Sequence, residues 1–178
     1  MVHRPEVGRI AVIGHRKLEV SPSLVTAVDA ALDRARTLCG SPERIELLSP
    51  LADGSDRLVA AVALEHADTS LIAVLPLPKN DYLQDFTTPD SRAEFEGLLA
   101  RAARVETPPS SRERTRAYAA VGRDIVDRCD VLVALWDGRP PRGVGGTGET
   151  VDYARRVGRP IVWVALDDDG SARLKELR

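Results

Sequence analysis

The chain has 178 residues, which suits one domain with a substantial core, because chains of roughly 150 residues already bury most of the surface that unfolding would expose. Hydrophobic residues make up 43% and charged residues 29%, an ordinary globular composition, and aromatic residues make up only 4%, so the core must be aliphatic. The net charge of −2 provides no general attraction for nucleic acid. We therefore expect no nucleic-acid partner, and any phosphate site must be built locally.

The sequence indicates neither a disulfide framework nor membrane insertion. The spacing of Cys39 and Cys129 matches no metal motif, and two cysteines do not make a disulfide framework, so we interpret both as small buried hydrophobic residues. No apolar run approaches the ~18 residues of a membrane span, and residues 1–6 lack an apolar signal core. We expect a cytoplasmic protein that requires no metal and no cofactor.

In the first half of the chain, short apolar runs alternate with longer amphipathic stretches. The pattern predicts a strand at 9–13, a helix from Pro22 to Leu38, a strand at 45–48, a helix at 54–66 and a strand at 71–75. Ser21 is a good helix cap, and the proline that follows it suits the first helical turn.

The pattern of the second half is less regular at its start. Residues 79–89 are predicted to form a loop that carries Tyr82 and Phe86, and Ser91 with Glu94 forms a capping-box pattern ahead of a helix. The later pattern predicts a very short strand at Val105, a helix over 112–128, a strand at 131–136, a helix at 149–157 and a strand at 160–165.

The predicted strands are continuous apolar runs, which is typical of parallel strands that are buried on both faces. Their alternation with helices predicts a single Rossmann-like α/β domain over residues 1–178, doubly wound, with helices on both faces of a mainly parallel sheet. In the commonest order of such sheets, strand 131–136 lies beside strand 9–13, on opposite sides of the switch point. Ligands of such folds bind there, at the carboxyl ends of the strands.

Three loops follow strands that should be neighbours in this order, and each combines glycine with arginine or a hydroxyl group. They are residues 14–16, 49–57 and 137–150, and we expect them to line one cleft. The ligand-binding residues predicted from them are Gly14, His15, Arg16, Gly54, Asp56, Arg57, Asp137, Gly145, Gly146, Thr147, Gly148, Glu149 and Thr150.

The glycine-rich loop at 143–148 is the strongest of these signals. Glycines let the backbone approach a ligand closely, and the following helix directs free N–H groups and its positive dipole end at that ligand. These are the properties of a phosphate site, although a flexible loop without a ligand is the alternative. The side chains that could add donors or positive charge are Arg139, Arg142, Thr147 and Thr150.

The same loop matches the dinucleotide pattern G-x-G-x-x-G, with Asp167 to Asp169 about 20 residues further on. A lone match is weak, and in true dinucleotide sites the first glycine stands at the strand end of the first strand–helix unit. Here residues 137–142 intervene. We therefore reject a conventional NAD-dependent oxidoreductase.

The remaining candidates have two interpretations each. His15 is interpreted as a hydrogen-bond donor or a structural residue rather than a base, and Arg16 as a phosphate contact. Asp56 and Arg57 form either a surface ion pair or part of the site.

The acidic residues near the glycine loop are equally open. Glu149 and Asp152 could contact ribose hydroxyls or act on a glycosidic bond, which makes them the catalytic candidates, or they could only complement the helix dipole. Asp137, at a strand end, has the same ambiguity.

These residues resemble the SLOG superfamily, the Rossmann-like group that contains the Lonely Guy phosphoribohydrolases and DNA-processing protein A. The resemblance covers about residues 8–166, and its motifs are Gly14–Arg16, Ser49–Arg57 and Gly145–Thr150. The phrases Leu75–Pro78 and Asp130–Gly138 resemble a bacterial, sensor-like branch.

The resemblance implies a nucleotide-type ligand over the glycine loop and a homodimer, with contacts expected around 79–90 and 112–128. The related hydrolases carry Pro-Gly-Gly-x-Gly-Thr-x-x-Glu at this loop, whereas this chain has Val144 for the proline, Glu149 for the threonine and Asp152 for the final glutamate. No arginine can be matched to their catalytic one. These departures favour a module that binds or senses a nucleotide over the alternative, an N-glycosidase that acts on nucleoside monophosphates; an interaction domain without a ligand is a third class.

Overall fold

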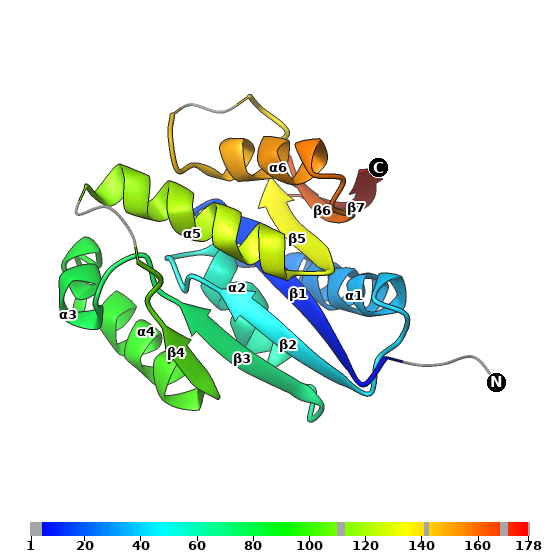
Figure 1. Cartoon of the computed structure of the whole chain (residues 1–178), viewed down its shortest axis with the longest axis horizontal. Coiled ribbons are helices and arrows are strands. Elements are labelled where there is room, and N and C mark those ends of the chain that lie inside the picture. Colours follow the sequence, from blue (N-terminus) through cyan, green and yellow to red (C-terminus); the bar gives the residue numbers. More distant parts are fainter. Residues whose placement is uncertain (1–4, 110–112, 141–142, 168–170, 178) are drawn as a thin grey trace.

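The computed structural model describes residues 5–109, 113–140, 143–167 and 171–177, which form a layered α/β domain (Figure 1). Its centre is a 7-stranded sheet with the order β4-β3-β2-β1-β5-β6-β7. The strands are β1 (Val7–Gly14), β2 (Arg44–Ser49), β3 (Thr69–Val74), β4 (Arg104–Glu106), β5 (Val131–Trp136), β6 (Ile161–Leu166) and β7 (Ala172–Leu177).

The pairing of the strands confirms the predicted fold class. β1 pairs in parallel with both β2 and β5, so the expected neighbours lie side by side on the two sides of the switch point. β7 is antiparallel to β6 and was not predicted. Its sequence, Ala-Arg-Leu-Lys-Glu-Leu, has no continuous apolar run, because an edge strand does not need to be buried on both faces.

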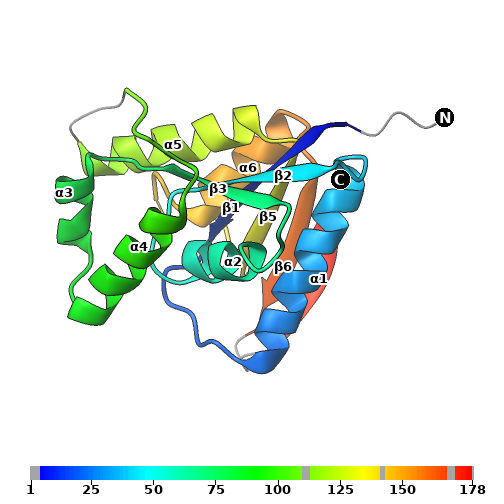
Figure 2. The same cartoon turned by 90° about the horizontal axis from the view of Figure 1, so that it is seen from below.

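Helices cover both faces of the sheet (Figure 2). The helices α1 (Pro22–Leu38), α2 (Ser55–Ala63) and α4 (Pro89–Arg101) lie on one face, and α5 (Arg114–Arg128) and α6 (Thr147–Arg156) lie on the other. Ser21 caps α1 as predicted, since its side chain accepts the N–H of Leu24. No helix in the described ranges is long and apolar enough to cross a membrane.

The sheet separates two apolar layers, as strands buried on both faces require. Along β1, Ile10 and Val12 pack into the layer of α1 and α2, whereas Ala11 packs into the layer of α5 and α6. Every residue of β5 is buried. β1 and β5 are therefore held rigidly from both faces, and so are the starts of the loops that follow them.

The segment after β3 differs from the prediction. Residues expected to form a loop contain the short helix α3 (Lys79–Tyr82) and the 3-10 turn η1 (Leu83–Asp85). The cap of α4 is Thr88, which accepts the N–H of Ser91, so the predicted capping box starts at the wrong residue.

The aromatic residues of this segment are not exposed, contrary to our expectation of a dimer contact. Tyr82 is 0% and Phe86 is 1% exposed, and they pack edge-on against each other with ring centroids 4.9 Å apart. Phe95 of α4 completes the cluster. The short elements α3 and η1 thus place the rings of Tyr82 and Phe86 inside the domain.

Candidate functional site

A cleft of about 430 Å³ opens at the carboxyl ends of the parallel strands, at the switch point between β1 and β5. Residues of all three predicted loops line it: Gly14 to Arg16 after β1, Asp56 after β2, and the glycine-rich loop after β5. A volume of this size lies within the usual range for small-molecule sites, roughly 300–1,000 Å³.

His15 connects the loops at the floor of this cleft. Its backbone N–H donates to Leu135 O, and its carbonyl accepts both the N–H and the hydroxyl of Ser55, at 3.1 and 2.9 Å. Its Nε2 lies 3.1 Å from the N–H of Asp137 and accepts it. These bonds give His15 a structural role, because they tie the end of β1 to β5 and α2.

Two glycines allow the loops to pack closely around His15. A Cβ added at Gly14 would lie 2.4 Å from the Cβ of Ser55. Gly54 has a φ of 80°, and a Cβ there would lie 2.4 Å from the carbonyl oxygen of Arg16. Gly54 therefore acts through the packing of two loops and does not line the cleft.

Asp137 and Arg139 form one wall of the cleft. The Asp137 carboxylate accepts the N–H of Arg139 at 3.0 Å and lies 3.3 Å from His15 Nε2. Burial raises the pKa of Asp137, but the Arg139 N–H and the contacts with His15 outweigh it and hold that pKa below its usual value. Asp137 is therefore a carboxylate at neutral pH. Arg142 lies outside the described residues.

The glycine-rich loop is seated on α5. Gly145 has a φ of 80°, and a Cβ there would lie 2.9 Å from the carbonyl oxygen of Thr115. Glu149 reaches back from the first turn of α6 to accept the N–H of Gly145 at 2.5 Å. Arg123 of α5 lies 3.4 Å from the other oxygen of that carboxylate. Glu149 thus fixes the conformation of the loop, and the contacts with Gly145 and Arg123 occupy both oxygens of its carboxylate.

The N-terminus of α6 opens into the cleft without a side-chain cap. Gly146 is the N-cap residue, and no side chain in the described part of the chain caps it. Gly146, Thr147 and Gly148 line the cleft, so the first N–H groups of α6 face a space rather than a protein partner. Thr150 is 5% exposed and packs against Gly122 of α5, which places its hydroxyl between helices and outside the cleft lining.

The loop after β2 adopts a strained conformation that its own side chains hold. Leu51 has a φ of 56°, which costs a residue with a side chain about 1–2 kcal/mol. Its N–H donates to Ser49 Oγ at 3.1 Å, and its carbonyl accepts Arg57 Nε at 3.0 Å. Residues Ser49 to Arg57 therefore form a turn that is held by its own hydrogen bonds. This turn brings Pro50 and Ala52 to the cleft lining.

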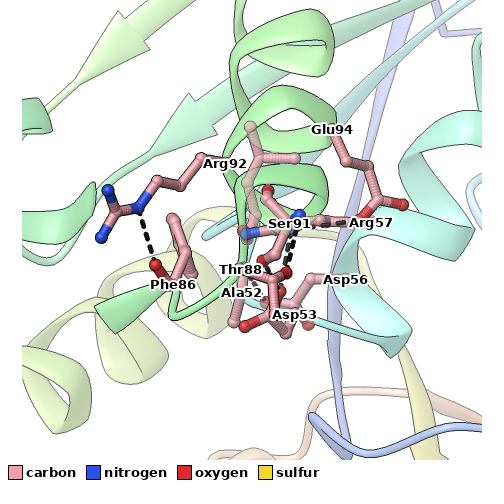
Figure 3. Close-up of polar contacts among 10 residues, drawn as sticks. Ala52, Asp53, Asp56, Arg57, Phe86, Thr88, Ser91, Arg92 and Glu94 are labelled. Atoms are coloured by element: carbon pink, nitrogen blue, oxygen red, sulfur yellow. Dashed lines mark hydrogen bonds and ion pairs between the residues drawn. The ribbon is translucent and has the colours of Figure 1, made fainter. Parts of the chain in front are cut away.

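Arg57 is not part of the cleft lining, and its guanidinium lies among Asp53, Ser91 and Glu94 (Figure 3). Its side chain is 0% exposed, and its Nη1 lies 2.8 Å from Asp53 and 3.1 Å from Glu94. The same nitrogen donates to the carbonyl and hydroxyl oxygens of Ser91. The guanidinium carbon stacks 4.2 Å above the Phe86 ring. Arg57 is thus neither half of a surface ion pair nor part of the cleft lining. It is a buried residue that links α2 to α4.

Asp56, the residue before Arg57, lies toward the cleft instead. It is 1% exposed and lines the cleft, and its Oδ2 accepts the N–H of Ala52 at 3.2 Å. Burial raises the pKa of Asp56 to about 7, against the opposing effects of the Ala52 N–H and of the charges on Arg16 and Arg57.

The cleft contains aromatic residues that sequence reasoning missed. Tyr82, Tyr118 of α5 and Trp136 all line it. Arg16 is exposed at its edge, with its guanidinium carbon 4.7 Å above the ring of Tyr118. The available signal was their rarity: with only 4% aromatic residues, a tyrosine in a polar segment is unusual.

The structure thus divides the predicted site residues into two groups. The residues that line the cleft are Gly14, His15, Arg16, Asp56, Asp137, Gly145, Gly146, Thr147 and Gly148. Those outside its lining are Gly54, Arg57, Glu149, Thr150 and the catalytic candidate Asp152, which lies 3.8 Å from Arg155 on α6.

Comparison with solved structures supports the architecture. The X-ray structure of TM1055, a structural genomics target, superposes with a TM-score of 0.51 at 16% sequence identity and covers 92% of this chain and 76% of that one. No protein-family model and no curated protein matches the sequence. At this identity the similarity concerns the fold alone, and the chain has a Rossmann-like α/β fold.

Proposed function

We propose that this domain binds or senses a phosphate-bearing nucleotide or nucleotide derivative in the cleft at the switch point. The observation that carries the proposal is the uncapped N-terminus of α6, which faces a cleft of about 430 Å³ through a glycine-rich turn. A phosphate there would accept the N–H groups of Gly146 to Gly148 and gain the helix-dipole contribution. Arg16 and Arg139 stand at the same cleft.

The proposal includes the resemblance to SLOG domains, because residues from each of the three motifs that carry it line this cleft. It also includes a homodimer. Because Tyr82 and Phe86 are buried, the contact must use other residues, and the exposed face of α5 is the remaining candidate from the sequence. Light scattering at high micromolar concentration tests this directly, and a monomer there would contradict the dimer.

The positions of the two catalytic candidates from the sequence, Glu149 and Asp152, favour binding without chemistry over hydrolysis. Glu149 is bonded to Gly145, and Asp152 lies outside the cleft lining. A glycosidase needs a carboxylate free to act near the anomeric carbon of the sugar, and neither candidate has that freedom here. We therefore expect no release of free base when the protein is incubated with nucleoside monophosphates.

Calorimetry with inorganic phosphate and a panel of nucleoside monophosphates tests the proposal. Gly146→Val should abolish phosphate binding, because the side chain would occupy the approach to the N–H groups. The fold should survive, since a Cβ at Gly146 meets only the carbonyl oxygen of Gly143, at 3.7 Å. Arg16→Ala should weaken binding by about 1.5–3 kcal/mol if its charge meets the phosphate.

Two results would contradict this proposal. Equal affinity of wild type and Gly146→Val would show that the α6 N-terminus is not the phosphate site. Steady release of base by wild type, abolished by Glu149→Ala or Asp152→Ala while binding persists, would establish the hydrolase instead.

A further inference from the structure

The end of the cleft near β2 contains buried polar groups that no protein atom satisfies. Asp56 Oδ1, the Tyr82 hydroxyl and the Tyr118 hydroxyl are buried atoms without a hydrogen-bond partner in the described chain. All three residues line the cleft, and Asp56 and Tyr82 are 1% and 0% exposed. The three side chains come from α2, α3 and α5, so the fold brings them together from distant parts of the sequence.

The rings of Tyr82 and Tyr118 pack in the domain, but the three polar atoms take no part in hydrogen bonds within the described residues. The adjacent Arg57 differs in its position, because its Nε and Nη1 bond the backbone and side chains of two elements, and its own unpartnered atom, Nη2, lies outside the cleft lining. Asp56 instead receives one backbone N–H and leaves its second oxygen unbonded. An unsatisfied buried polar group destabilises a fold, so its retention at the lining of a cleft points to an external partner.

We propose that Asp56, Tyr82 and Tyr118 form a second subsite that binds a hydrogen-bond-donating, uncharged part of the ligand. This inference rests on the proposed function and assigns an orientation to the ligand: phosphate at α6, and the sugar or base toward β2. The oxygens of a carboxyl group accept hydroxyl or amino hydrogens well, and its ionised form repels phosphate. The ribose hydroxyls offer such hydrogens, and so does the base, through an exocyclic amine, as in adenine, or a ring N–H, as in hypoxanthine.

The test compares four probes on the intact protein: inorganic phosphate, ribose 5-phosphate, adenosine monophosphate and inosine monophosphate, which lacks the exocyclic amine. Asp56→Asn preserves shape and can still accept the Ala52 N–H, but it replaces the unbonded oxygen with a donor. This variant should bind inorganic phosphate with unchanged affinity. Its affinity for any probe that reaches the subsite should fall by roughly 10- to 100-fold. Tyr82→Phe should act in the same direction.

The probes also identify which part of the ligand is bound. If ribose 5-phosphate shows the Asp56→Asn loss, the ribose hydroxyls occupy the subsite. If only adenosine monophosphate shows it, and inosine monophosphate binds wild type more weakly, the exocyclic amine does. Either result supports the subsite. Tyr153→Phe is the matched control, because its hydroxyl bonds Asp127 at 2.7 Å outside the cleft lining, and all affinities should be unchanged.

Failure of this inference can be distinguished from failure of the proposed function. If phosphate binds and Gly146→Val abolishes it, but neither Asp56→Asn nor Tyr82→Phe changes any affinity, the phosphate site stands and the subsite is wrong. If no probe binds wild type, both the proposed function and the subsite are wrong. A melting temperature of the free protein that drops in Asp56→Asn and Tyr82→Phe, without loss of affinity, would show that these groups are structural and would also overturn the subsite.

Discussion

Two adjacent residues, Asp56 and Arg57, show how little a side chain's type reveals about its role. Both are at most 1% exposed, yet Asp56 lines the cleft and Arg57 bonds α4 on the far side of the turn. The sequence suggested either a surface ion pair or a shared role in the site. It could not separate them, because consecutive residues of α2 point in directions about 100° apart, and the sequence does not show which of the two faces the cleft.

Loss of the Arg57 side chain should strongly destabilise the domain. Arg57→Ala would leave the buried carbonyl oxygen of Leu51 unpaired and remove the stacking on Phe86. We expect the free energy of unfolding to fall by about 3 kcal/mol. Arg57→Lys should also be destabilising, because an ammonium group cannot reproduce the fork of donors. Urea unfolding measures both.

The control for this prediction is Arg116→Ala on α5. Arg116 pairs with Glu113, but its side chain is 73% exposed, and a change there should stay within about 0.5 kcal/mol. Similar losses in the two alanine variants would contradict the structural role of Arg57.

Asp56 should make the stability of the ligand-free protein depend on pH. Its folded-state pKa is raised from 3.8 to about 7, so the folded state holds the proton more tightly than the unfolded state. Its contribution to the unfolding free energy therefore falls as pH rises from about 4 to about 7 and is constant above that. Burial raises this pKa, and the Ala52 N–H and the charges of Arg16 and Arg57 oppose the rise.

Asp56→Asn removes this titration, so the variant should gain stability relative to wild type across that window, by at most roughly 4 kcal/mol. Urea unfolding of both proteins at pH 5 and pH 8 measures the difference. Asp152→Asn is the control, because Asp152 is half-exposed on α6 and lies outside the cleft lining. Parallel pH profiles for wild type and Asp56→Asn would refute the assignment.

At the scale of elements, the sequence predicted the glycine-rich loop as a candidate phosphate site. It did not predict that the loop packs against α5. Its glycines suggested freedom for a ligand, whereas Gly145 is required by the approach of the loop to α5. Glu149, taken as a catalytic candidate, accepts the N–H of Gly145 instead. Contacts of the loop with α5 and with the first turn of α6 decide both points, and no spacing in the sequence encodes them.

Glycines of this loop should therefore differ sharply in their tolerance of alanine. Gly145→Ala introduces a Cβ 2.9 Å from Thr115 O at a φ of 80°, so the loop must move away from α5. We expect phosphate affinity to fall at least tenfold, with a stability loss of about 1–2 kcal/mol. Gly143→Ala is the matched control, since nothing lies within 4 Å of its Cβ. Calorimetry that finds the two variants alike would exclude this account of the loop.

For the whole molecule, the order of the parallel strands followed from apolar runs and the statistics of doubly wound folds. β1, β2, β3, β5 and β6 were each predicted, because each carries a run that is buried from both faces. β7 escaped prediction, since half of an edge strand faces solvent. The helix α3 escaped because four residues are too few to show a period.

Ligand binding should stabilise the entire domain. The cleft is lined by segments that follow β1, β2 and β5 and by residues of α3, α5 and α6, so a bound nucleotide would contact both halves of the sheet. A nucleoside monophosphate at 100 times its Kd should stabilise the folded state by about 2.7 kcal/mol. For a domain of this length, that raises the melting temperature by roughly 5–10 °C. Gly146→Val should melt near the ligand-free wild type and show no such rise. A rise of equal size in Gly146→Val would place the ligand elsewhere on the protein and exclude the cleft as its binding site.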